Sequence, residues 1–118
     1  MHRELRFSQL SPQRQALVRL CQSINYGHIQ DLAVAEREPI LTGAGTVALV
    51  DLRLDADPGL RDELATVDFS LCAEVCRLMS LLDEVGNGGI SKIEVRAGIP
   101  RRILVESRLT EAGNLIGR

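Results

Sequence analysis

The chain has no tryptophan and few other aromatic residues, with one tyrosine and two phenylalanines among 118 residues. Proteins that bind single-stranded nucleic acid usually stack bases on aromatic side chains, so this scarcity counts against that class. Long apolar runs are missing as well, because the longest, such as Val47 to Val50, extend over only a few residues. Such runs are too short for a membrane-spanning helix. The segment Met1 to Phe7 has no apolar signal core behind its arginines, and we therefore expect a cytoplasmic protein.

Cysteine is scarce too, and its three copies, Cys21, Cys72 and Cys76, make an odd number. All three occupy apolar positions of predicted helices, where a thiol behaves as a small hydrophobic group. Cys72 and Cys76 are four residues apart and could supply two zinc ligands, but no further Cys-x-x-Cys or His-x-x-x-His segment completes a tetrahedral site. The sequence thus predicts reduced core cysteines, no metal and no other cofactor.

The remaining composition is that of a folded protein, with 45% apolar and 25% charged residues. A length of 118 residues suits a single domain with a core of its own, so we expect one domain over residues 1–118. The net charge of −2 hides an acidic middle and a basic end, since residues 51–85 carry nine acidic and three basic groups and residues 86–118 carry three and six. Such separation can steer a partner or a second copy.

Two helices are predicted from apolar spacing and from residues that start or stop helices. Ser11-Pro12 is typical of a helix start. The Ser side chain can accept a hydrogen bond from a free N–H group there, and Pro at the first helical position lacks an N–H that would have no partner anyway. That helix should stop near Asn25 to Gly27. The second runs to about Val85, from Phe69 and, if kinked, from Leu60. It carries two neighbouring apolar stripes, of which the first comprises Leu71, Val75, Leu78, Leu82 and Val85 and the second comprises Phe69, Cys72, Cys76 and Met79. Two stripes exceed what one small sheet usually covers.

Each helix is followed by a predicted pair of strands. After the first helix, inward positions are Ile29, Leu32 and Val34, and a second strand runs from Thr46 to about Leu54. After the second helix, a hairpin runs from Ile90 to Ala97, turns at Gly98-Ile99-Pro100, and returns over residues 101–109.

These two units are related by an internal repeat, which is the most informative pattern in the chain. At an offset of 61, Leu17, Leu20, Gly27, Ile29, Leu32, Val34 and Pro39 recur as Leu78, Leu81, Gly88, Ile90, Ile93, Val95 and Pro100. After the turn the offset is 55, because Ala48 to Leu54 matches Ile103 to Leu109. The difference of six equals the length of Leu41 to Thr46, which we interpret as a longer loop in the first hairpin.

The repeat predicts a fold. A single helix-strand-strand unit has too little core to be stable, since an isolated hairpin is marginal in water. Two units, over about residues 10–55 and 68–110, can share a core around a pseudo-twofold axis. We therefore expect an α+β fold of order αββαββ, with a four-stranded antiparallel sheet and both helices on one face. The pattern leaves open which strands meet at the centre.

Each half also resembles the small YezD-like bacterial proteins, in which one helix ends in a segment like Ile-x-Tyr-Gly and two strands follow. Residues 24–29, Ile-Asn-Tyr-Gly-His-Ile, carry the resemblance in the first half, and residues 85–90, which lack the tyrosine, carry it in the second. The resemblance implies a fused version of a unit that otherwise pairs as separate chains. It brings no activity with it.

Catalysis has one candidate pair, His28 and Asp31, because a His near a carboxylate can act as a general base. No nucleophile accompanies them in sequence, and the matching positions of the second half are Gly89 and Lys92. We therefore expect a protein that is not an enzyme.

A recurrent polar pattern points instead to an interaction surface. Asp51-x-Arg53 and Glu106-x-Arg108 recur on the returning strands, and side chains two apart on a strand share a face. The residues expected on the sheet face away from the helices are Asp51, Arg53, Glu106, Arg108, Lys92, Glu94, Arg96, Leu49 and Leu104. Exposed ion pairs on a water-facing sheet would by themselves explain the charged ones. The leucines favour binding, because they add apolar area.

The leading hypothesis is a non-catalytic protein-interaction or regulatory module. We expect a homodimer that associates through the second apolar stripe of the second helix or through the open sheet face. The alternative is an accessory protein that binds nucleic acid with the basic C-terminal hairpin, where Arg101 and Arg102 would contact phosphates. The slightly acidic net charge counts against that alternative.

Overall fold

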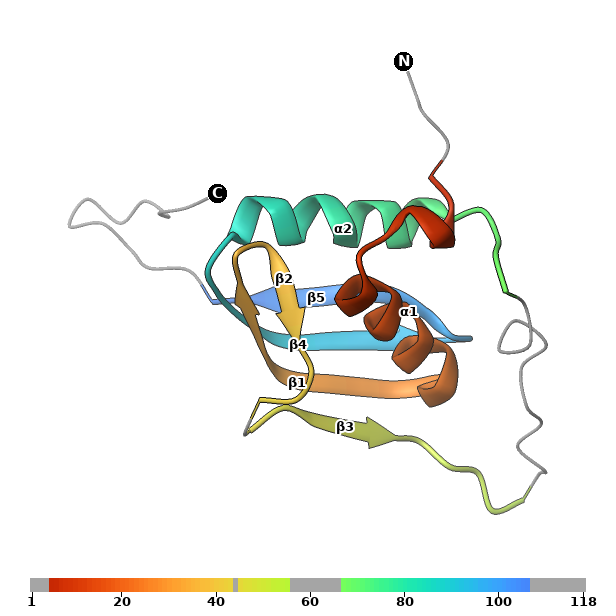
Figure 1. Cartoon of the computed structure of the whole chain (residues 1–118). Helices are drawn as coiled ribbons and strands as arrows, with labels where there is room; N and C mark the ends of the chain where they lie inside the picture. The colour runs from red at the N-terminus through yellow and green to blue at the C-terminus, as the bar shows by residue number, and fades with distance from the viewer. Residues whose placement is uncertain (1–4, 44, 56–66, 107–118) are drawn as a thin grey trace.

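Two helices of 13 residues pack on an antiparallel sheet in the computed structural model, which describes residues 5–43, 45–55 and 67–106 (Figure 1). The elements in chain order are a 3₁₀ turn η1 (Phe7–Gln9), α1 (Pro12–Ile24), β1 (Tyr26–Ala35), β2 (Glu38–Ile40), β3 (Val47–Val50), α2 (Ala73–Val85), β4 (Gly88–Arg96) and β5 (Ile99–Val105). The α+β class expected from the sequence is therefore confirmed. Neither helix is long and apolar enough to cross a membrane.

The sheet has β1 and β4 at its centre. They pair along most of their length, from Tyr26 opposite Arg96 to Val34 opposite Gly88. Beyond β4 lies β5, and both β2 and β3 lie on the far edge of β1 (Figure 1). All four pairings are antiparallel. The strand pair that the sequence left undecided is thus β1 with β4.

The expected four-stranded sheet is wrong by one strand, because the returning strand of the first hairpin is interrupted. Its first part, β2, pairs with residues 33–35, and its second part, β3, pairs with residues 27–30. The turn between them holds Thr46, whose Oγ1 donates to the carbonyl oxygen of Asp31 at 3.0 Å. This second part also ends at Val50 rather than near Leu54.

The match of the two returning strands at an offset of 55 is also wrong, by two positions. Val50 lies opposite Gly27, whereas Val105 lies opposite Ile90 rather than Gly88. Ala48 and Val105 are the residues that face the matched pair Ile29 and Ile90, so the correct offset here is 57. The interruption therefore takes up four extra positions, not six. A shift of two keeps each side chain on its expected face of the sheet.

Backbone angles repeat at the offset of 61 in the two hairpins. The residues after the helices, Asn25 and Gly86, have φ of 63° and 65°. In the turns, Glu36 and Arg37 have φ of 51° and 68°, and Ala97 and Gly98 have 54° and 76°. These angles place the second turn at residues 97–98, one position before the expected Gly98-Ile99-Pro100.

Each turn is also bound to the end of the opposite helix. The N–H of Arg37 donates to the carbonyl oxygen of Gly86 at 2.7 Å, and the N–H of Gly98 donates to that of Asn25 at 2.8 Å. Both donors and both acceptors are again related by the offset of 61. Each half therefore holds the other half's helix end.

The core lies on one face of the sheet. The fully buried residues of β1 and β4 include Ile29, Leu32, Ile90, Ile93 and Val95, and they belong to a single cluster with Leu17, Cys21 and Ile24 of α1 and Val75, Leu78 and Leu82 of α2. Both helices therefore cover the same face, as the sequence predicted. Burial of Cys21 raises the pKa of its thiol to about 12, so that cysteine stays protonated.

The second apolar stripe of α2 is covered by the chain's own N-terminal segment. The N–H of Phe7 donates to the carbonyl oxygen of Phe69, and the N–H of Leu71 donates to that of Leu5, both at 2.8 Å. The rings of Phe7 and Phe69 stack with centroids 4.9 Å apart. This pairing holds residues 69–72 extended, so α2 begins at Ala73 rather than at Phe69. The alternative start at Leu60 lies outside the described residues.

Asp68 fixes this N-terminal segment. Its carboxylate accepts hydrogen bonds from Nε of Arg6 at 2.8 Å and from the N–H of Ser8 at 2.9 Å, and these two contacts lower its pKa to about 2 from an ordinary 3.8. A lowered pKa means that the stabilisation is complete above pH 3.8 and is lost as the pH falls toward 2.

Asp68→Asn should therefore be less stable than the parent at neutral pH and lose less stability between pH 4 and 2. Urea titrations at a series of pH values measure both effects. Parallel curves for the two proteins across this range would contradict the assignment.

Candidate interaction surface

The sheet face away from the helices carries two rows of side chains in register. One row runs Leu49, His28, Glu94 and Arg102 across β3, β1, β4 and β5, and the next runs Val47, Gln30, Lys92 and Leu104 across the same strands. Alternating residues of a strand point to opposite faces, so both rows point away from the core. We call these eight residues the open face.

The open face combines apolar and charged groups. Val47, Leu49 and Leu104 are 44%, 45% and 48% exposed, and Tyr26 beside them is 49% exposed. Near the β5 side, Lys92, Glu94, Arg102 and Leu104 line a hollow of about 90 Å³. Leaving large apolar side chains half in water is unfavourable, at roughly 25 cal/mol per Å² of apolar surface. A covering partner would remove that cost.

The structure places five of the residues expected at an interaction surface on or beside the open face: Leu49, Leu104, Lys92, Glu94 and Arg96. Glu94 and Arg96 form an ion pair at 2.9 Å. Glu106 directly follows β5, and Arg108 lies outside the described residues.

Asp51 and Arg53 are not part of the strand that the sequence predicted for them. Both lie beyond the end of β3, where the N–H of Asp51 donates to the carbonyl oxygen of Tyr26 at 2.7 Å. Arg53 instead binds both carboxylate oxygens of Asp55, at 3.0 and 2.7 Å. That contact raises the pKa of Arg53 and lowers the pKa of Asp55. The pair is exposed, so its effect on stability is small.

The two arginines expected to contact phosphates differ in their surroundings. Nη1 of Arg101 donates to Oε2 of Glu74 at 2.5 Å, so its charge is already compensated. Arg102 lies opposite Glu94 across the sheet and forms no ion pair within the described ranges. With Arg77 and the apolar Leu78, Leu81 and Ile103, they line a groove of about 250 Å³ between α2 and β5.

Both residues of the candidate catalytic pair lie on β1. His28 lies between Leu49 and Glu94 in the sheet register. Asp31, three positions later, has a φ of 57° and marks a local irregularity of β1. In the part of the chain that the structure describes, no hydrogen bond joins the two side chains. Nor is there, among those residues, a cluster of three or more metal-ligating side chains.

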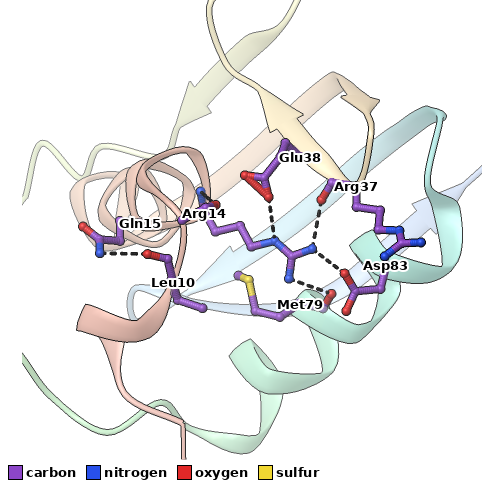
Figure 2. Close-up of polar contacts among 8 residues, drawn as sticks. Leu10, Arg14, Gln15, Arg37, Glu38, Met79 and Asp83 are labelled. Carbon is purple, nitrogen blue, oxygen red and sulfur yellow. Dashed lines mark hydrogen bonds and ion pairs between the residues drawn. The ribbon is translucent and has the colours of Figure 1, made fainter.

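A largely buried arginine that the sequence did not single out as a structural residue connects both halves. Figure 2 shows the guanidinium of Arg14, from α1, between the first turn and α2. It donates to Oε1 of Glu38 at 3.1 Å, to Oδ1 of Asp83 at 2.5 Å, and to the carbonyl oxygens of Arg37 at 2.9 Å and Met79 at 3.4 Å (Figure 2). Only 13% of its side chain is exposed. We call these contacts the Arg14 junction.

A cavity of about 380 Å³ adjoins the Arg14 junction. Cys76 also lines it, with a thiol whose pKa is raised by burial first and by the neighbouring Cys72 second. Because Arg14 is already bonded to two carboxylates and two carbonyls, it has little capacity left for an anion. The junction therefore serves to hold the halves together.

No family model, no curated protein and no solved structure matches the chain.

Proposed function

We propose that the chain is a non-catalytic protein-interaction module that works as a homodimer and binds its partner with the open face. The observation that carries this proposal is the apolar area left uncovered on the sheet face away from the helices, where Val47, Leu49 and Leu104 are 44%, 45% and 48% exposed. The N-terminal segment already covers the second stripe of α2, which leaves the open face of the two surfaces expected to associate. A partner with apolar side chains beside acidic and basic ones would match it.

Duplication of one helix-strand-strand unit is part of this proposal. The repeated φ values, the equal helix lengths and the reciprocal bonds of Arg37 and Gly98 support it. The register of β1 with β4 supports it too, because Gly27 opposite Val95 and Val34 opposite Gly88 are exchanged by the same offset of 61. If the halves resemble YezD-like chains, the fusion joins in one polypeptide what two chains would form elsewhere.

Self-association is tested by the molar mass in solution. Sedimentation velocity over a concentration series should show a dimer, with a mass near twice 12.9 kDa. A chain that stays monomeric at the highest concentration reached contradicts the proposal.

The groove beside Arg77 and Arg102 favours one alternative, binding of nucleic acid by the C-terminal hairpin. Phosphate contacts release counterions, so affinity for a mixed-sequence oligonucleotide should then fall steeply with rising salt. Since Arg101 is paired with Glu74 and Arg96 with Glu94, we expect no more than weak binding. Tight binding that Arg102→Gln weakens would favour this alternative over the interaction module.

A further inference from the structure

β3 is an edge strand of unusual composition. Its four residues, Val47 to Val50, are all apolar and all exposed, and it pairs with β1 on one side only within the described sheet. A strand that exposes apolar side chains on both faces and unpaired backbone groups at its edge is a template for another strand.

The hydrogen bonds show which backbone groups of β3 are free. In an antiparallel pair, every second residue directs both its N–H and C=O toward the neighbouring strand. The N–H of Asp51 donates to the carbonyl oxygen of Tyr26, so by alternation Leu49 and Val47 also face β1. The N–H and C=O of Ala48 and Val50 therefore point away from the sheet.

The opposite edge of the sheet is protected. β5 contains Pro100 and two adjacent arginines, and its register with β4 shifts so that Arg101 bulges out between Pro100 and Arg102. Proline, charge and bulges are the devices that keep edge strands from pairing. β3 has none of them.

We infer that the homodimer forms by antiparallel pairing of β3 with β3 of a second copy. With Ala48 opposite Val50 of the second copy, the free groups of both residues meet those of the other strand around a twofold axis at Leu49. A neutral strand suits a copy of itself, because no like charges oppose each other. Pairing β3 with β5 instead would meet the protected edge. The two sheets become one, and the two open faces become one continuous surface.

This inference rests on the proposed self-association and specifies its geometry. The experiment compares sedimentation of the parent chain with Ala48→Pro, which removes an N–H that points away from β1 and so spares the pairing within the chain. We expect the dissociation constant of the dimer to rise at least roughly tenfold, because two backbone bonds per dimer are lost. Ala48→Lys, which keeps the N–H but charges the edge, should act in the same direction.

The matched controls are Ala48→Val, which keeps both the N–H and the apolar edge, and Lys92→Glu, which alters the open face and not the edge. Both should remain dimeric. An unchanged dimer for Ala48→Pro and Ala48→Lys overturns the edge pairing. A dimer that Lys92→Glu dissociates instead would assign the contact to the open face, leaving self-association intact. A monomeric parent chain contradicts the proposed function itself.

Discussion

Gly27→Ala should destabilise the protein by about 3 kcal/mol or more and release β3 from the sheet. A Cβ atom at this position would lie 2.0 Å from the carbonyl oxygen of Leu49. This oxygen belongs to the backbone and cannot rotate away as a flexible side chain could. Either β3 or the start of β1 must then move. Because β3 is the proposed dimer edge, the variant should also lose self-association.

Gly88→Ala is the matched control. Gly88 is the first residue of β4 and Gly27 is the second residue of β1, and both have a φ of 157°, which L-residues rarely adopt. A Cβ atom there would have only Cγ1 of Val85 nearby, at an ordinary 3.5 Å. We expect about 1 to 2 kcal/mol for this substitution, from the backbone angle alone. Equal losses for the two variants in urea unfolding would contradict the close approach of β3 to Gly27.

Arg14→Met should cost about 2 to 3 kcal/mol of unfolding free energy, because removing one partner of a largely buried pair leaves the other without compensation. Here Glu38 and Asp83 would both lose their cation. The cost is lower than for a fully buried pair because the Asp83 side chain is 58% exposed. Arg14→Lys keeps the charge but cannot reach all four acceptors, so its stability should fall between those of the parent and Arg14→Met.

Arg53→Met serves as the control for removing an arginine. Arg53 also pairs with a carboxylate, but the side chains of Arg53 and Asp55 are 72% and 70% exposed, and the loss should be near zero. Thermal or urea unfolding of the three variants measures the order. If Arg14→Met and Arg53→Met are equally stable, the Arg14 junction does not hold the halves together.

Local signals in the sequence predicted the elements well. Ser11 caps α1 by accepting from the N–H of Arg14 at 3.2 Å, and Pro12 takes the first helical position. The alternating apolar residues of β1 and β4 are buried, as their spacing indicated. These predictions succeed because a cap or a strand period depends on a few neighbouring residues.

Features that depend on distant residues were missed. The split of the returning strand into β2 and β3 depends on which part of β1 each piece meets, and apolar spacing does not contain that information. The match of Val50 with Val105 rested on a run of similar side chains, and a strand shifted by two keeps the same faces. The register of the strands across the sheet therefore follows only from the observed strand pairing, not from the pattern of side chains.

The surfaces were predicted only in part, because distant segments of the chain cover some of them. Leu49, Leu104, Lys92 and Glu94 were placed on the open face by strand parity alone. The second stripe of α2 looked free because nothing in the sequence connects Phe7 with Phe69, which lie in opposite halves of the chain.

Arg14 looked like an ordinary polar residue of an amphipathic helix. The four partners of its guanidinium all lie outside α1, on the first turn, at the start of β2 and on α2.

Amide hydrogen exchange along β3, followed by NMR at increasing protein concentration, tests the proposed assembly most directly. The amides of Val47 and Leu49 face β1 and should be protected at every concentration. Those of Ala48 and Val50 should exchange fast in dilute solution and become protected as dimers form. If the Ala48 and Val50 amides exchange equally fast in samples that are dimeric by mass, the copies do not meet at this edge.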